Sequence, residues 1–277
     1  FGQPSGSALF EQNVVYDNWS VNMYFDNQPN NVARNNFIYN HPLDFNPATT
    51  DFLYVSNTLF PYNQLGKYSV CLMIADEQTS SNGTSNYAAL DASKVYNNII
   101  AGCRIGIRDY GEGAITQNYH ALKNTLIANN TIVMPSYVIP NTTTYGIFLT
   151  DNAGRNVNTV IANNIIYGYN NDSLIYSEAS GPLTGITLNN NLYYSTGATP
   201  FGSGSSSARL YNFAGWKANA AGSDTNSLFA DPQFVDVNHF KTTGPTAYLF
   251  NNADLLSTSP ARGKGATQNI NPTVNYR

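Results

Sequence analysis

Five short segments of the sequence end in a carboxylate that follows a run of mostly apolar residues. They are Asn22-Met-Tyr-Phe-Asp26, Leu72-Met-Ile-Ala-Asp76, Ile105-Gly-Ile-Arg-Asp109, Ile147-Phe-Leu-Thr-Asp151 and Leu174-Ile-Tyr-Ser-Glu178. If these segments are strands that stack in parallel, the carboxylates form one column with neighbours about 5 Å apart. That separation suits a retaining glycosidase, and a wider one leaves room for the water of an inverting enzyme. Crowding also raises the pKa of at least one carboxylate in such a row.

Two of these segments carry further charged residues that could complete an active site. Glu77 follows Asp76, Arg108 precedes Asp109, and Glu112 lies shortly after. Carboxylates of unequal pKa supply a general acid and a general base at neutral pH, and an arginine could serve as the base of a uronan lyase. We therefore expect the catalytic residues to be Asp76, Asp109, Arg108 and Glu112. Alternatively, Asp76, Glu77 and Asp109 could hold Ca2+, which takes several carboxylate and carbonyl oxygens.

Each of these residues also has a purely structural interpretation. Aspartate at the end of a strand is a common turn former, and Arg108 can pair with Asp109 on the surface. A buried unpaired carboxylate is costly, so the column must lie at a bend, turned outward or hydrogen-bonded. The three histidines have no metal-ligand spacing, and no catalytic-triad, phosphate-loop or dinucleotide pattern stands out.

The alternation within these segments predicts which side chains face outward. If the columns that start at Asn22 and Tyr24 face inward, the columns that contain Met23 and Phe25 face outward. A row of exposed apolar side chains marks either a binding face or a surface covered by a loop, and aromatic rings could stack on sugar rings. The expected substrate-binding residues are Asp26, Asp151, Phe25, Phe148 and Tyr110.

The elements that must position these residues are recognised from a repeat. Asn followed by two or three apolar residues recurs, with apolar residues also before the Asn, so each unit reads as strand, Asn corner, strand. The copies begin at Asn13, Asn36, Asn98, Asn130, Asn164 and Asn191. With the acid-ending segment as a third strand, the pattern is typical of a parallel solenoid. The long gap after Asn36 holds either a degenerate copy near Asn57 or one large insertion.

The asparagine at each corner has a physical reason. Asn tolerates left-handed backbone and hydrogen-bonds local main chain. When coils stack about 4.8 Å apart, the side-chain amides can also bond to one another from coil to coil. The corner residues therefore predict an Asn ladder.

At this point the sequence resembles a known superfamily. Repeats such as Asn163-Asn-Ile-Ile-Tyr167, with strands such as Gly146-Ile-Phe-Leu149, resemble right-handed parallel β-helix proteins of the pectate-lyase-like superfamily over roughly residues 8–195. The segments Asp231–Asp236 and Ser259–Gly265 resemble a C-terminal ending common in secreted bacterial β-helices. The resemblance implies that the acid-ending strands form the first sheet, which carries the substrate cleft in the superfamily's polysaccharide enzymes.

Composition narrows the function classes. Charged residues are only 11% of the 277 residues, and Asn, with 40 copies, is the commonest residue, which together with 20 Tyr argues against disorder and against helical bundles. The net charge of −4 and the lack of a basic run argue against nucleic-acid binding. No apolar run approaches the length of a membrane span. The composition suits an extracellular or cell-surface protein.

The organisation follows from these observations. We expect an all-β fold, a right-handed parallel β-helix of about six to seven coils over residues 8–196, and an irregular capping region over residues 197–277. Cys71 and Cys103 should be close on adjacent coils, as a disulfide or as two buried thiols. Because only seven residues precede the first strand, we expect another chain or a missing N-terminal segment to stack on the first coil.

Two functions remain in competition. The first is an extracellular polysaccharide-active or polysaccharide-binding β-helix, a lyase or a glycoside hydrolase if it is an enzyme, with its cleft on the first-sheet face. The second is a non-enzymatic surface, adhesive or structural protein. No cofactor is expected apart from Ca2+ in the acidic row.

Overall fold

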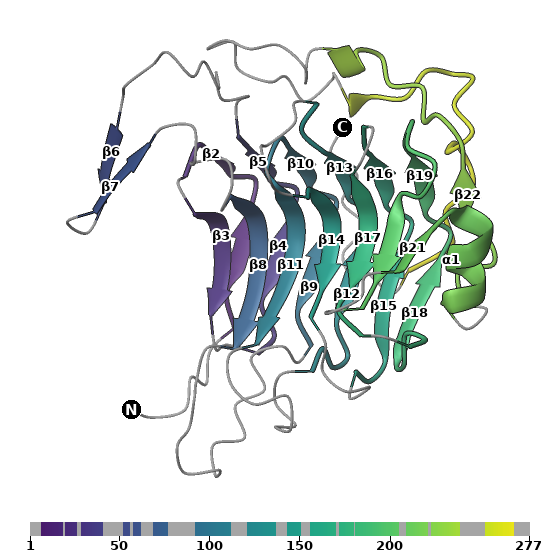
Figure 1. Cartoon of the computed structure of the whole chain (residues 1–277), viewed down its shortest axis with the longest axis horizontal. Helices are drawn as coiled ribbons and strands as arrows, with labels where there is room; N and C mark the ends of the chain where they lie inside the picture. Colours follow the sequence, from purple (N-terminus) through teal and green to yellow (C-terminus); the bar gives the residue numbers. More distant parts are fainter. Residues whose placement is uncertain are drawn as a thin grey trace.

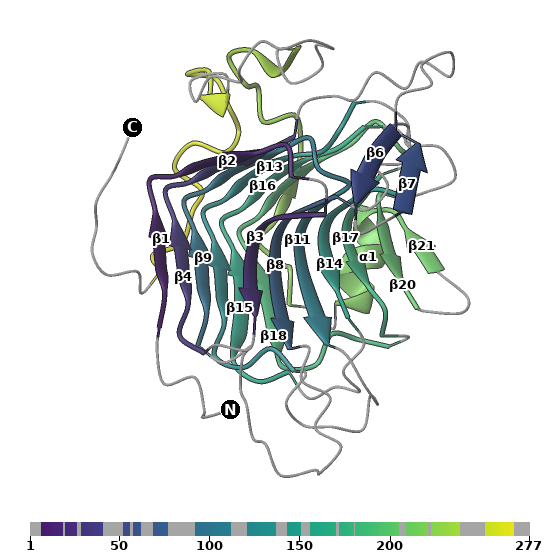
Figure 2. The same ribbon diagram turned by 90° about the vertical axis from the view of Figure 1, so that its left-hand side faces the viewer.

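The chain winds into a right-handed parallel β-helix in which each turn contributes one strand to each of three sheets (Figures 1 and 2). The computed structural model describes residues 7–18, 20–26, 29–40, 52–55, 58–61, 69–76, 92–111, 121–136, 143–150, 156–169, 172–179, 181–204, 209–220, 223–238 and 253–268. This arrangement confirms the expected all-β solenoid.

The strands of the three sheets follow one another in chain order. Sheet A contains β1 (Leu9–Glu11), β4 (Val32–Arg34), β9 (Lys94–Tyr96), β12 (Leu126–Ala128), β15 (Thr159–Ala162) and β18 (Ile186–Asn189). Sheet B contains β2 (Val14–Tyr16), β5 (Phe37–Tyr39), β10 (Ile99–Ala101), β13 (Thr131–Val133), β16 (Ile165–Tyr167), β19 (Leu192–Tyr194) and β22 (Leu228–Phe229). Sheet C contains β3 (Val21–Asp26), β8 (Val70–Asp76), β11 (Ile105–Gly111), β14 (Tyr145–Leu149), β17 (Ser173–Ser177), β20 (Phe201–Ser203) and β21 (Arg209–Tyr211).

We call one strand from each sheet a coil, and the described residues form six coils, from β1–β2–β3 to β18–β19–β20. The long gap after the second corner is an insertion and not a degenerate coil. It contains β6 (Phe52–Val55) and β7 (Thr58–Pro61), which pair antiparallel with each other as a separate two-stranded sheet. In Figure 1 this hairpin projects away from the stack.

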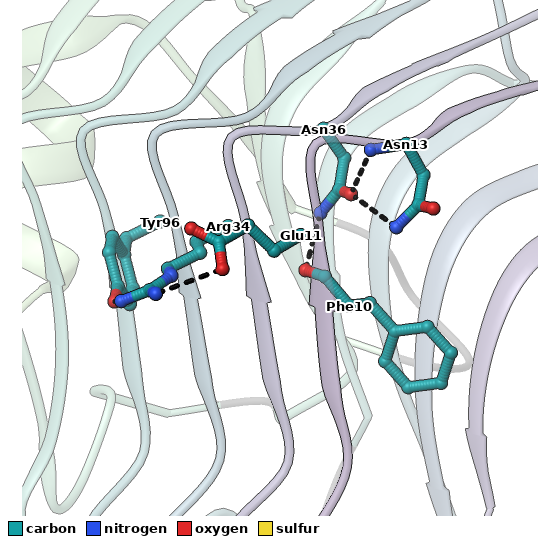
Figure 3. Close-up of polar contacts among 6 residues, drawn as sticks. All are labelled: Phe10, Glu11, Asn13, Arg34, Asn36 and Tyr96. Carbon is teal, nitrogen blue, oxygen red and sulfur yellow. Dashed lines mark hydrogen bonds and ion pairs between the residues drawn. The ribbon is translucent and has the colours of Figure 1, made fainter. Parts of the chain in front are cut away.

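The corner between sheets A and B is held by the expected Asn ladder. Asn130 is representative: its backbone N–H and its Nδ2 each donate to Oδ1 of Asn164 at 3.0 Å, and its Nδ2 also donates to the carbonyl of Val95 at 2.9 Å. Its own Oδ1 accepts from the N–H and the Nδ2 of Asn98. The same pattern runs from coil to coil through Asn13, Asn36, Asn98, Asn130, Asn164 and Asn191. Figure 3 shows its first step.

The left-handed residue of the corner is the one before the ladder asparagine. These residues have φ between 52° and 59°: Gln12, Asn35, Asn97, Asn129, Asn163 and Asn190. Most are asparagine, which tolerates this conformation better than other side chains. In each Asn-Asn pair the first residue thus makes the turn, and the second, buried residue forms hydrogen bonds to the adjacent coils.

The core lies inside the triangle of sheets and is closed at the C-terminal end. β20 completes the sixth coil beyond residue 196, and β21 then pairs antiparallel with β20. Helix α1 (Phe213–Asn219) follows, and its Trp216 is fully buried and stacks on Phe201 with ring centroids 5.2 Å apart. The Trp216 Nε1 donates to the buried Asp224 at 3.1 Å. The helix and β22 therefore cap the last coil.

Cys71 in β8 and Cys103 just before β11 form a disulfide, with Cα atoms 5.6 Å apart. Both residues are buried in the core. The bond therefore links the second and third coils, as the sequence predicted.

Candidate functional site

The register of sheet C does not produce the expected column of carboxylates. Asp26 lies opposite Ala75, and Ala75 lies opposite Tyr110. Asp109 lies opposite Ile74, while Asp76 lies opposite Gly111. The carboxylates therefore occupy different positions along the strands, and the expected alignment of the five segments on their terminal acids is wrong.

Asp109 belongs to the inward-facing column of sheet C. Its neighbour on the second coil, Ile74, and the residue opposite Ile74 on the first coil, Phe25, are core residues, and Asp109 itself is 3% exposed. The backbone N–H of Thr150 donates to its Oδ1 at 2.6 Å, and the Thr150 hydroxyl donates to its main-chain carbonyl at 2.7 Å. Burial raises the pKa of Asp109 to about 7, with the Thr150 N–H and the Arg108 charge acting against that rise. In this position the carboxyl has no outward contact surface.

The other acidic candidates are placed only in part. Asp26 is exposed at the end of β3, and Glu178 follows β17. Asp76 ends β8, but its side chain, like Glu77, Glu112 and Asp151, lies outside the described residues. Within the described ranges no group of three or more metal-binding side chains occurs. Since Asp109 points into the core, the expected Ca2+ set of Asp76, Glu77 and Asp109 lacks one outward-facing member.

The outer face of sheet C carries a continuous aromatic surface. One outward column places Tyr24, Met73, Arg108, Phe148 and Tyr176 on successive coils. Tyr110 and Tyr145 flank this column. We call this surface the aromatic platform; its residues are Tyr24, Met73, Arg108, Tyr110, Tyr145, Phe148 and Tyr176.

The rings of the platform contact one another across coils. Phe148 stacks on Tyr176 with centroids 5.5 Å apart, and Tyr145 meets Phe148 edge-on at 4.9 Å. The hydroxyl of Tyr176 donates to the carbonyl of Gly204 at 2.5 Å. Met73 and Phe148 are each 8% exposed, whereas the tyrosines are half-buried. The tyrosines therefore form the accessible part of the platform.

Arg108 lies at the centre of the platform between two rings. Its Cζ is 4.7 Å from the centroid of Tyr110 and 5.2 Å from that of Phe148. Its Nε is buried and finds no hydrogen-bond partner among the described residues. Arg104 repeats the motif at one side, with its Cζ 5.7 Å from the Tyr145 ring and its Nε bonded to the carbonyl of Thr143. Arg108 as a whole is half-buried, and a partly exposed cation held between rings is chemically suited to a polar or anionic ligand, although its buried Nε is not within reach of one.

Several expected outward residues face the core instead. Phe25, Met23 and Ile175 are buried in the main core cluster, so Phe25 is not accessible as a substrate-binding residue. Conversely, Tyr24 and Tyr176, which were expected to face inward, lie on the platform. Of the sequence candidates, the structure brings Arg108, Tyr110 and Phe148 together. Tyr145 is not among the sequence candidates, because the predicted segment that ends at Asp151 begins at Ile147.

Comparisons with known proteins add no family assignment: no protein-family model and no curated protein sequence matches this chain. Among the residues that the structure describes, no helix combines the length and hydrophobicity that a membrane crossing requires.

Proposed function

We propose that this protein is an extracellular or cell-surface β-helix that binds a polysaccharide along the outer face of sheet C. The observation that carries the proposal is the half-buried Arg108, held between Tyr110 and Phe148 on the outer face of sheet C. The superfamily resemblance of the repeats supports a carbohydrate ligand. The Cys71–Cys103 disulfide supports an oxidising compartment.

The chemistry of the platform suits a chain of sugars. Tyrosine rings offer flat apolar faces for the C–H face of a sugar and a hydroxyl for its polar edge. Arginine donates several hydrogen bonds in one plane and pairs with carboxylates in a bidentate manner. Since platform positions recur on successive coils about 4.8 Å apart, an extended ligand can contact several coils at once. Binding, rather than turnover, is the function that these residues support.

The first test is binding to a panel of acidic and neutral polysaccharides, measured by affinity electrophoresis and calorimetry. Replacing Arg108 by Ala should weaken binding roughly tenfold, because a cation and its hydrogen bonds are lost from the platform. The matched control is Lys217→Ala. That substitution removes a cation lying 4.7 Å from the Phe213 ring on the capping helix α1, which is not part of the aromatic platform, and it should leave affinity unchanged.

A second arm separates acidic from neutral ligands and binding from catalysis. Binding of an acidic polymer should weaken with salt, because exposed charge interactions are screened. Each polymer is also assayed, with Ca2+ present, for new reducing ends and for unsaturated uronate absorbance. If the protein binds no polymer, or if Arg108→Ala and Lys217→Ala bind equally well, the proposal is wrong. Turnover would show that binding is one step of catalysis.

A further inference from the structure

The N-terminal end of the solenoid is chemically open. β1, β2 and β3 are the edge strands of sheets A, B and C, and no described strand pairs with their outer edges. The inward side chains of this coil, Phe10 and Val15, are only partly buried, although the equivalent Ala33 and Ile38 of the second coil are fully buried. In Figure 2 the strands β1, β2 and β3 form one end of the stack.

Asn13 at this edge has an incomplete set of ladder bonds. Its N–H and its Nδ2 donate to Oδ1 of Asn36 at 3.0 and 3.1 Å. By contrast, Oδ1 of Asn36 accepts from the preceding coil, and Nδ2 of Asn36 also donates back to the carbonyl of Phe10 at 3.0 Å. Among the described residues, Asn13 lacks both of these bonds: its Oδ1 accepts none and its Nδ2 makes no backward donation. Figure 3 shows the Asn13 oxygen pointing away from Asn36.

The ladder bonds that Asn13 does not make indicate which kind of partner fits this edge. The missing partners are two donors for Oδ1 and one carbonyl for Nδ2. A coil that precedes in the stack offers that combination, as Asn164 and the carbonyl of Ile161 do for Asn191. At the other end of the ladder, Asn191 donates its N–H to Ser227 and β22 pairs with β19, so among the described residues the ladder is open at Asn13 only.

A second copy of this chain cannot supply the same groups. Its N-terminal edge brings the same open Oδ1 and Nδ2, because its Asn13 N–H and its Phe10 carbonyl are already bonded to Asn36. At its C-terminal end β22 covers the edge of sheet B, and the N–H of Asn191 already donates to Ser227. In either arrangement, head-to-head or head-to-tail, Oδ1 of Asn13 would therefore not receive both of its hydrogen-bond donors.

We propose that the edge formed by β1, β2 and β3 is an interface for one further coil of a parallel β-helix. This coil is stacked in the same direction, has an asparagine at its corner, and continues the chain's own stacking order on its N-terminal side. It would also cover Phe10 and Val15, whose partial exposure a polar ligand would not relieve.

The test supplies such a coil from the protein itself. A copy of residues 158–185 is joined directly to Ala8, which places the copied Asn164 over Asn13, because Asn164 holds the same relation to Asn191. The matched control carries Leu in place of Asn at the copied Asn164 only. Hydrogen exchange of the β1 and β2 amides should slow about tenfold or more in the extended protein, and the control should lose most of that protection.

Three results would overturn the proposal. They are an isolated chain in which β1 is already as protected as β4, an added coil whose own amides stay unprotected, and a Leu control that protects as well as the Asn version. A dimer of the isolated chain that disappears when the coil is added would instead assign the edge to a second copy.

Discussion

Among the side chains that the structure describes, an inward-facing carboxyl, that of Asp109, distinguishes sheet C from the other two sheets. Asp109 occupies a position that is Phe25, Ile74 or Ser177 on other coils. Its burial cost is reduced by the Thr150 N–H and by the protonation that its raised pKa favours. We therefore interpret the buried Asp109 first as a residue that affects the stability of the fold, and only second as a candidate catalytic residue.

The stability of the protein should fall as the pH rises from about 4 to about 7. The pKa of Asp109 is about 7 in the fold and about 4 in an unfolded chain. The folded state thus binds more protons in this window, and its advantage is lost as the pH passes the folded pKa. For Asp109 the loss is on the order of 4 kcal/mol. Chemical denaturation at several pH values measures it.

Replacing Asp109 by Asn should flatten that pH dependence. Asn keeps the acceptor for the Thr150 N–H and has no proton to lose. Some slope should remain, because burial also raises the pKa of Asp172 to about 7. The exposed Asp254→Asn variant serves as the control and should follow the wild type. An unchanged slope in Asp109→Asn would show that Asp109 is ionised throughout.

At the scale of elements, the A–B corner could be predicted from the sequence and sheet C could not. Every ladder Asn is followed at once by a sheet B strand, so the corner has a fixed length that a repeat search detects. The link from sheet B to sheet C varies, because the stretch from Asn130 to Tyr145 is about twice that from Asn98 to Ile105. Register across a variable link is set by packing, and a one-residue slip exchanges the two faces. The terminal acids were therefore unreliable markers of the column, although they did locate the strands.

The ladder predicts a sharp contrast between neighbouring asparagines. Asn130→Leu should destabilise the protein by roughly 3–5 kcal/mol, because buried donors and acceptors on the two flanking coils lose their partners. Asn129→Gly should change stability by less than about 1 kcal/mol, because Asn129 is exposed and glycine accepts its left-handed backbone. Urea unfolding of both variants measures the difference. Equal effects would mean that the ladder contributes little beyond turn formation.

At the scale of the whole molecule, the coils are also connected along their outer surface. Asn163 forms a pair of hydrogen bonds with the backbone of Ala266, and Asn190 Nδ2 donates to the carbonyl of Lys264 at 2.9 Å. The C-terminal segment thus crosses the fifth and sixth coils at the A–B corner. The turn residues Asn163 and Asn190 therefore also hold the C-terminal segment against the coils. The repeat pattern in the sequence does not show this second role.

The Cys71–Cys103 bond has a mechanical consequence. When a solenoid is pulled from its two ends, coils peel away in order and each releases its length of chain. The disulfide closes a loop with a sequence separation of 32 residues, so about 110 Å of contour cannot extend while the bond is intact. Single-molecule force spectroscopy should show that much extra extension after reduction, and the Cys71→Ser variant should show it without reductant. A surface protein under tension would thereby keep its second and third coils tethered after the rest had unravelled.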